Sequence, residues 1–175
     1  MANAIIKRKA YEVEISLIKQ EIHILAANQD AAVGKIIKFD LTRILRGKNL
    51  EANLIIRKEN DKLIADFVSL NLVQSYIRRM MRRGINYIED SSVYPTKEGK
   101  FIIKPFLLTR RKVHRSIRKE IRNKTKESIA EFVKEKSNKE IFFSIIYGGM
   151  QKEISSKIKK ICPIALVEIR VAKIK

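Results

Sequence analysis

Positions of alternating polarity dominate the first part of the chain and predict β-strands. Apolar residues alternate with polar ones in the stretch 11–17, with the period of two that is typical of a half-buried strand. The stretch 33–41 is rich in β-branched and aromatic residues and predicts a second strand. Alternation at 50–56 and again at 63–67, with a polar cluster between, predicts a hairpin. The stretch 18–32 is interpreted as helical or loop-like.

From position 72 the spacing of apolar residues changes to that of a helix. Apolar residues of 72–81 cover about half of the helix circumference, and Gly84 is expected to cap its end. The other half carries Arg78, Arg79, Arg82 and Arg83. Arginines in a last turn complement the negative end of the helix dipole, but this structural role accounts better for two arginines than for four.

Alternation returns in the middle of the chain. The stretches 85–95 and 100–108 predict a second hairpin, because 96–99 has the composition of a turn. Pro95 and Pro105 are expected at strand ends, edges or bulges, since proline cannot donate to a ladder.

The last part of the chain combines two short helices with a strand. Ser137 and Glu140 have the spacing of a capping box and predict the start of a helix that the glycine pair 148–149 ends. A further amphipathic helix is expected around 150–161, and alternation at 167–171 predicts a closing strand. The predicted fold class is therefore α+β, with a mainly antiparallel β-barrel-like core and flanking amphipathic helices.

The segment 108–126 combines a short apolar stripe with a dense basic face. If it is a helix, Val113, Ile117 and Ile121 fall on one side. The facing stripe carries Arg111, Arg115, Arg118 and Arg122. Each like-charge pair at helical spacing costs an isolated helix about 0.2–0.5 kcal/mol. A line of phosphates would remove this penalty.

The composition points to the same kind of partner. The chain has 38 Lys and Arg against 19 Asp and Glu, which leaves a formal net charge of +19 over 175 residues. Self-repulsion on this scale favours a polyanionic partner, and the planar guanidinium can grip a phosphate with two hydrogen bonds. Nucleic acid is therefore the expected partner class.

The hydrophobic content, 45%, is high enough for a packed core, and a single domain over 1–175 is expected, with 1–9 as a flexible basic arm. One cysteine and two histidines argue against a disulfide framework and a zinc site. No apolar run is long enough to span a bilayer, and no signal peptide is recognised. We expect a cytoplasmic protein with no membrane partner, no metal and no cofactor.

The residues also allow functions other than nucleic-acid binding. Asp90, Glu98 and Lys100 have the residue types of a metal-dependent nuclease, but turn composition explains them more simply. A free-standing nucleic-acid-binding regulator is also compatible with the composition, and a membrane-surface protein is less so.

Three aromatic residues could contact bases directly. Tyr87, Tyr94 and Phe106 could stack on unpaired bases, but packing within a sheet is the favoured interpretation.

Five segments, in order, resemble the S-three-A-e (eukaryotic-type S-one) family of archaeal and eukaryotic small-subunit ribosomal proteins. The segments are VGKIIKFDLT from Val33, ADFVSLNL from Ala65, YIRRMMRRG from Tyr76, EDSSVYPTKEGKFIIKPFLLTRR from Glu89 and IKKICPIALVEIR from Ile158. None is diagnostic alone, because basic helices and hairpins are common. Their order and spacing across most of the chain make the resemblance fairly specific.

The resemblance implies a structural protein of the small-subunit platform near the messenger RNA exit, which binds ribosomal RNA and neighbouring ribosomal proteins and catalyses nothing. Messenger RNA is a further candidate partner. By position in the matching motifs, the residues that resemble the family's RNA-facing basic residues are Arg78, Arg79, Arg82, Arg83, Arg110 and Arg111. Lys112, Arg115, Arg118 and Arg122 would continue that surface.

Overall fold

The computed structural model describes residues 8–18, 20–45, 47–60 and 62–175. The predicted basic arm over 1–9 lies outside the described residues as far as position 7, and a strand begins at Lys9. The strands are β1 (Lys9–Ile15), β2 (Glu21–Ala26), β3 (Ile36–Asp40), β4 (Leu50–Glu59), β5 (Lys62–Leu72), β6 (Tyr87–Glu89), β7 (Ser92–Thr96), β8 (Gly99–Thr109) and β9 (Ile164–Ile174). The helices are α1 (Gln74–Met80), α2 (Arg115–Val133), α3 (Asn138–Ile146) and α4 (Gly149–Ile158).

The chain packs as two compact units. The first contains the described residues up to Phe39 together with Ala52–Val68, and the second contains Asp40–Glu51 and Ser69–Lys175. All ten sequence-predicted site residues belong to the second unit. The expectation of one domain over the whole chain stays a prediction.

The first unit is built from the N-terminal strands. β1 pairs antiparallel with β2 and parallel with β5, and β4 pairs with β3 and β5 as the predicted hairpin requires. β2 lies in the stretch interpreted as helical or loop-like, so that interpretation is wrong. Within β2, Ile22 and Ile24 alternate with Glu21 and His23. Pairing with β1 stabilises this short alternating segment as a strand.

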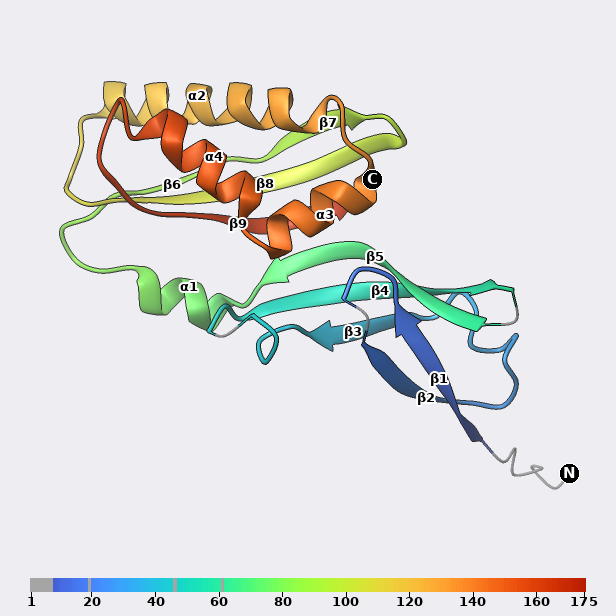
Figure 1. Cartoon of the computed structure of the whole chain (residues 1–175). Coiled ribbons are helices and arrows are strands. Elements are labelled where there is room, and N and C mark those ends of the chain that lie inside the picture. Colours follow the sequence, from blue (N-terminus) through green and yellow to red (C-terminus); the bar gives the residue numbers. More distant parts are fainter. Residues whose placement is uncertain (1–7, 19, 46, 61) are drawn as a thin grey trace, which may run out of the picture. The chain divides into compact units, whose positions relative to one another are not determined.

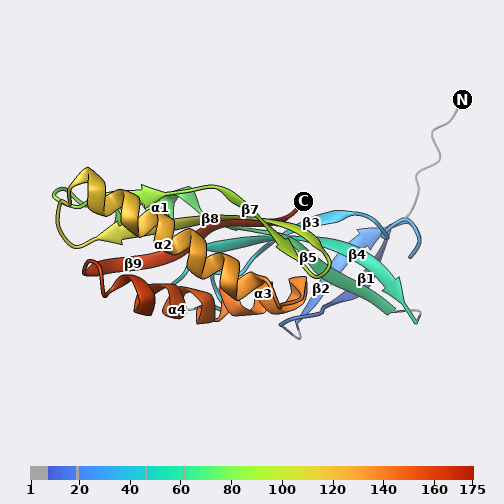
Figure 2. The same cartoon turned by 90° about the horizontal axis from the view of Figure 1, so that it is seen from above.

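The second unit carries its helices on a sheet centred on β8. This strand pairs antiparallel with β6, β7 and β9, and the end of β5 pairs with β9. α2, α3 and α4 pack against this sheet and one another (Figures 1 and 2). The rings of Phe101 in β8 and Phe142 in α3 meet edge to face at 5.1 Å between centroids. Ser137 and Glu140 form the predicted capping box at the start of α3.

The α+β, mainly antiparallel fold class is confirmed, but the barrel-like closure is wrong. Strand pairing follows the order β2-β1-β5-β9-β8-β6, and among the described residues no ladder joins β2 to β6. In the second unit, helices cover the apolar face of the sheet, so burial of that face does not require the sheet to close.

Both basic helices differ from the prediction at their ends. α2 begins at Arg115 because Leu108 and Thr109 extend β8, where both are buried and paired with β9. α1 ends at Met80, so Gly84 does not cap it. Gly84 instead lies in a turn at φ +85°, a conformation that favours glycine.

We expect Ile121→Ala to destabilise the protein by about 2–5 kcal/mol, because the side chain in α2 is completely buried and its loss would leave a cavity. Urea unfolding measures this change. Arg122→Ala, at the exposed neighbouring position, should alter the free energy of unfolding by less than about 0.5 kcal/mol. Equal effects of the two substitutions would contradict the packing of α2 described above.

Candidate nucleic-acid interface

One face of helix α2 carries arginines in the first half of the helix and mostly buried residues in the second half. Its buried residues are Ile121, Thr125, Ser128, Ile129 and Val133. The two buried hydroxyls stay within the helix, since Thr125 Oγ1 donates to the Ile121 carbonyl at 2.7 Å and Ser128 Oγ donates to the Lys124 carbonyl at 2.8 Å. Spacings of three and four residues put these side chains on one face, and the same spacings place Arg118 and Arg122 on that face, before Thr125.

The first half of α2 lines a hollow that we call the α2 hollow. Its lining residues are Tyr87, Arg115, Arg118, Lys119, Arg122 and Asn123, around a volume of about 620 Å³. Four of these six side chains are cations and none is a carboxylate. The hollow therefore favours a negatively charged ligand.

Ion pairs divide α2 into two halves. In the second half, Lys124 pairs with Glu127 at 3.0 Å and Glu131 with Lys157 at 2.7 Å. Lys126 also pairs with Asp90, at 3.1 Å. Among the described residues, no ion pair reaches the three arginines of the hollow. Their charge is thus not neutralised within the part of the chain that the structure describes.

The start of α2 adds to this excess of positive charge. The first turn contains no acidic residue, and the N-cap residue His114 makes no side-chain hydrogen bond to the helix. Unpaired amide groups and the helix dipole make this end electropositive. Arg115 begins the helix, where a cation is unfavourable and an anion would be stabilised.

The loop between β8 and α2 has a fixed backbone. The hydroxyl of Thr109 accepts a hydrogen bond from the Asn86 amide at 3.0 Å and donates to the Arg111 carbonyl at 2.6 Å. The Asn86 side chain accepts from the amide of Val113 at 2.8 Å. Arg111 and Lys112 are exposed on this loop and outside the helix, so the predicted stripe does not include Arg111.

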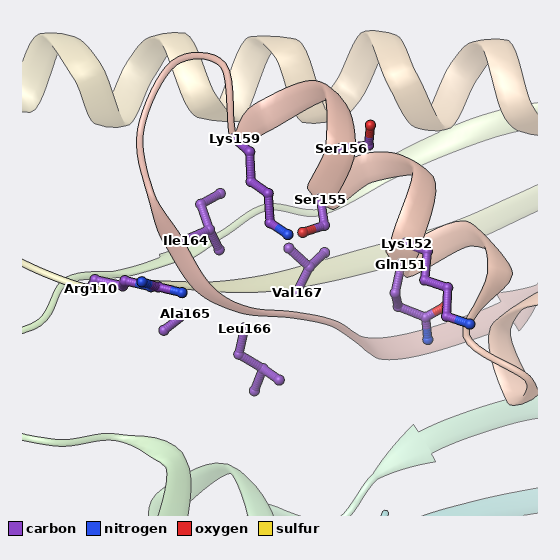
Figure 3. A pocket seen from close by; sticks show the side chains of 10 residues that line it. All are labelled: Arg110, Gln151, Lys152, Ser155, Ser156, Lys159, Ile164, Ala165, Leu166 and Val167. Carbon is purple, nitrogen blue, oxygen red and sulfur yellow. The ribbon is translucent and has the colours of Figure 1, made fainter.

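Arg110 lies in a different hollow, which we call the α4–β9 pocket. Its lining residues are Arg110, Gln151, Lys152, Ser155, Ser156, Lys159, Ile164, Ala165, Leu166 and Val167, around about 520 Å³. Figure 3 shows Arg110 on the loop after β8 and Lys159 directly after the end of α4, both lining the pocket. Three cations and two hydroxyls over an apolar floor suit a phosphate group, and none of the lining residues is acidic.

The arginines of α1 and of the residues after it, unlike those of α2, line neither the α2 hollow nor the α4–β9 pocket. Arg79 lies over the Tyr76 ring at 5.8 Å from its centroid and donates to the Asn49 side chain at 3.3 Å, so it has structural partners. Burial raises the pKa of Tyr76, while the guanidinium of Arg79 acts in the opposite direction. Arg82 and Arg83 are exposed beyond the end of the helix, which corrects the prediction that all four arginines share one helical face.

The structure thus brings together Arg115, Arg118 and Arg122 but places Arg110 in a separate pocket. Sequence reasoning missed Lys119 and Asn123 in the α2 hollow and Lys152 and Lys159 in the α4–β9 pocket. Lys119 follows Arg115 by four residues, and that helical spacing was a usable signal.

The residues of the nuclease alternative do not converge. Asp90 precedes β7 and Glu98 follows it, and the five residues of that strand cover about 16 Å. Asp90 is paired with Lys126, and Glu98 accepts a hydrogen bond from the Asn138 amide at 3.4 Å. Within the described ranges no group of three His, Cys, Asp or Glu residues could hold a metal ion.

No helix of the described residues is long and apolar enough to span a membrane.

Comparisons with known proteins point to a ribosomal family. The model of the Ribosomal S3Ae family matches residues 5–175. A protein of Saccharolobus solfataricus named small ribosomal subunit protein eS1 is 27% identical over 163 residues, covering 83% of this chain and 78% of that protein. Proteins of the same name from Methanothermobacter thermautotrophicus and Saccharolobus islandicus are 32% and 30% identical, covering 59% and 69% of this chain. The matches span 53% and 58% of those two relatives.

We expect the double variant Arg115→Gln/Arg122→Gln to unfold at a higher temperature than the wild type in low salt. Removing like charges should relieve about 0.2–0.5 kcal/mol per pair, because these arginines have no acidic partner among the described residues. Thermal unfolding followed by circular dichroism measures the difference, which should shrink in 1 M salt as charges are screened.

The matched control is Lys124→Gln/Lys126→Gln, which removes the same charge from the ion-paired half of α2. This variant should gain less stability or lose some. An equal gain in both variants would show that net charge, rather than the local arrangement, sets the effect.

Proposed function

Because the chain belongs to the Ribosomal S3Ae family, we propose that it is a structural constituent of the small ribosomal subunit and binds ribosomal RNA. It acts in translation on the cytoplasmic ribosome, without catalysis and without a cofactor. The α2 hollow is its principal RNA contact. The proposed contact residues are Arg78, Arg79, Arg82, Arg83, Arg110, Arg111, Lys112, Arg115, Arg118 and Arg122.

One observation carries this proposal: the arginines at the start of α2 have no acidic partner among the described residues. Such an arrangement costs stability in the free protein, since like charges repel one another and the helix dipole opposes them. Phosphates of an RNA backbone offset both effects. Because the backbone has the same charge in every sequence, affinity through this hollow depends on RNA shape and salt more than on base identity.

The remaining basic residues extend the proposed surface. Arg111 and Lys112 are exposed on the fixed loop that leads into α2, and Arg110 contributes to the α4–β9 pocket. Each can take a phosphate without reorganising the backbone, and a site ordered before binding loses less conformational entropy.

The position within the subunit is a finer part of the proposal. We place the protein on the platform near the messenger RNA exit, beside other small-subunit proteins, because the five ordered motifs of the sequence resemble a family known for that location. The curated relatives carry the name of a small-subunit ribosomal protein, which supports the proposed association with the small subunit. Messenger RNA is a further candidate partner.

We expect the triple variant Arg115→Glu/Arg118→Glu/Arg122→Glu to lose more than about 100-fold in affinity for small-subunit ribosomal RNA at moderate salt, through three lost phosphate contacts and added repulsion. The slope of log affinity against log salt should fall by about 2, since each contact contributes roughly 0.7–0.9. Filter binding over a salt series measures both quantities.

A triple reversal at exposed lysines outside both hollows, Lys134→Glu/Lys160→Glu/Lys175→Glu, is the control with the same change in net charge. It should bind far better than the arginine variant. If both variants lose affinity to the same extent, the α2 hollow is not the specific interface and the site assignment is wrong.

A further inference from the structure

Tyr87 is an exposed aromatic residue of β6, whereas the aromatic residues Tyr94 and Phe106 of the nearby strands are buried. Its side chain is 59% exposed in β6, whereas Tyr94 in β7 and Phe106 in β8 are 5% and 1% exposed. The favoured interpretation from sequence, packing within the sheet, is correct for Tyr94 and Phe106 but wrong for Tyr87. The next residue, Ile88, fills the core at 1% exposure, so the alternation of the strand turns Tyr87 outward.

The outward ring lies at a charged site. Tyr87 lines the α2 hollow together with Arg115, Arg118, Lys119, Arg122 and Asn123. In this site an aromatic ring, four cations and one amide side chain meet without a carboxylate. Tyr87 lies on a strand and the other five residues lie on the first turns of a helix. The tertiary structure therefore brings the ring and the cations together, although they are far apart in the sequence.

Hydrogen bonds fix the strand relative to the helix. Tyr87 pairs with Leu108 in the β6–β8 ladder. Its neighbour Asn86 donates its amide to the Thr109 hydroxyl at 3.0 Å, accepts from the Thr109 amide at 3.0 Å, and accepts from Val113 at the entry to α2 at 2.8 Å. The backbone at Tyr87 is therefore held relative to the start of α2 before any ligand binds.

We propose that the α2 hollow holds an unpaired nucleotide of RNA, with its base stacked on Tyr87 and its flanking phosphates on the arginines. This inference rests on the proposed RNA-binding function and specifies the kind of RNA segment bound. Every base has a face that can stack on an aromatic ring, and guanidinium groups pair with phosphates. Asn123 adds a donor and an acceptor for a base edge.

The base must be unpaired for a geometric reason. In a regular RNA duplex each base face is covered by the next base pair, so a tyrosine ring can only reach a face in a loop, a bulge or a single strand. The phosphate contacts alone would not distinguish a duplex from a single strand. Tyr87 thus selects the unpaired form, while the arginines supply the charge-dependent affinity.

The test uses the full-length protein with a ten-nucleotide single-stranded RNA that contains one 2-aminopurine, and with a duplex of the same length. We expect Tyr87→Ala to weaken binding of the single strand by about 5- to 100-fold, the range that base stacking on aromatic residues gives. Tyr87→Phe keeps the ring and should bind within about 2-fold of the wild type. The fluorescence of 2-aminopurine should be quenched by the wild type and Tyr87→Phe, and not by Tyr87→Ala.

Tyr147→Ala is the matched control, because Tyr147 is also exposed, at 57%, and does not line the hollow. It should leave both binding and quenching unchanged. Thermal unfolding of Tyr87→Ala checks that the fold persists, and Tyr87→Leu provides a second variant without a ring if the alanine variant does not fold.

The outcomes separate this inference from the proposed function. If the wild type binds neither RNA, the proposed function itself fails. If the arginine reversals abolish binding while Tyr87→Ala and Tyr87→Leu bind and quench like the wild type, RNA binding stands and stacking on Tyr87 is overturned. Equal losses for single strand and duplex in Tyr87→Ala would likewise overturn selection of an unpaired base.

Discussion

Repulsion among the cations on the first half of α2 is the constraint on which the rest of the interface depends. A helix that begins with Arg115, without an acidic first turn or a capping side chain, gains little from its own N-terminus. It must be held in place by tertiary packing. Completely buried Ile121, Ile129 and Val133 meet this need, and the ion pairs Glu131–Lys157 and Lys126–Asp90 stabilise the second half. The structure thereby keeps unneutralised charge at a fixed place on its surface.

The sheet contributes more than a support for that helix. β8 carries Thr109 at its end, and the hydrogen bonds between Thr109 and Asn86 connect β6, the basic loop and the entry to α2. An aromatic residue of one element and arginines of another therefore face the same space without a flexible connection. Ordering a site in advance reduces the conformational entropy lost on binding. A protein that must join a large assembly in one orientation benefits from such a rigid surface.

Much of the fold could be predicted from the sequence, because local pattern and tertiary structure agree at the alternating strands, the Ser137 capping box and α4. Where prediction and structure differ, strand pairing between distant segments outweighs the local sequence pattern. Leu108 and Thr109 have the spacing of the basic helix but are buried in the β8–β9 ladder, which moves the start of α2. Unpaired arginines could be anticipated from their spacing. The exposure of Tyr87 could not, because β6 has only three residues and a pattern that short does not reveal which face is covered.

Chemical modification of arginines, compared between the free protein and assembled small subunits, shows whether RNA covers the α2 hollow. Phenylglyoxal reacts with accessible guanidinium groups, and mass spectrometry assigns the modified residues. Arg115 and Arg122 are exposed in the free chain and should react there. We expect both to be protected within the subunit, with protection lost when the ribosomal RNA is digested. Equal reactivity of these arginines in the free and assembled protein would contradict the assignment of the α2 hollow as an RNA interface.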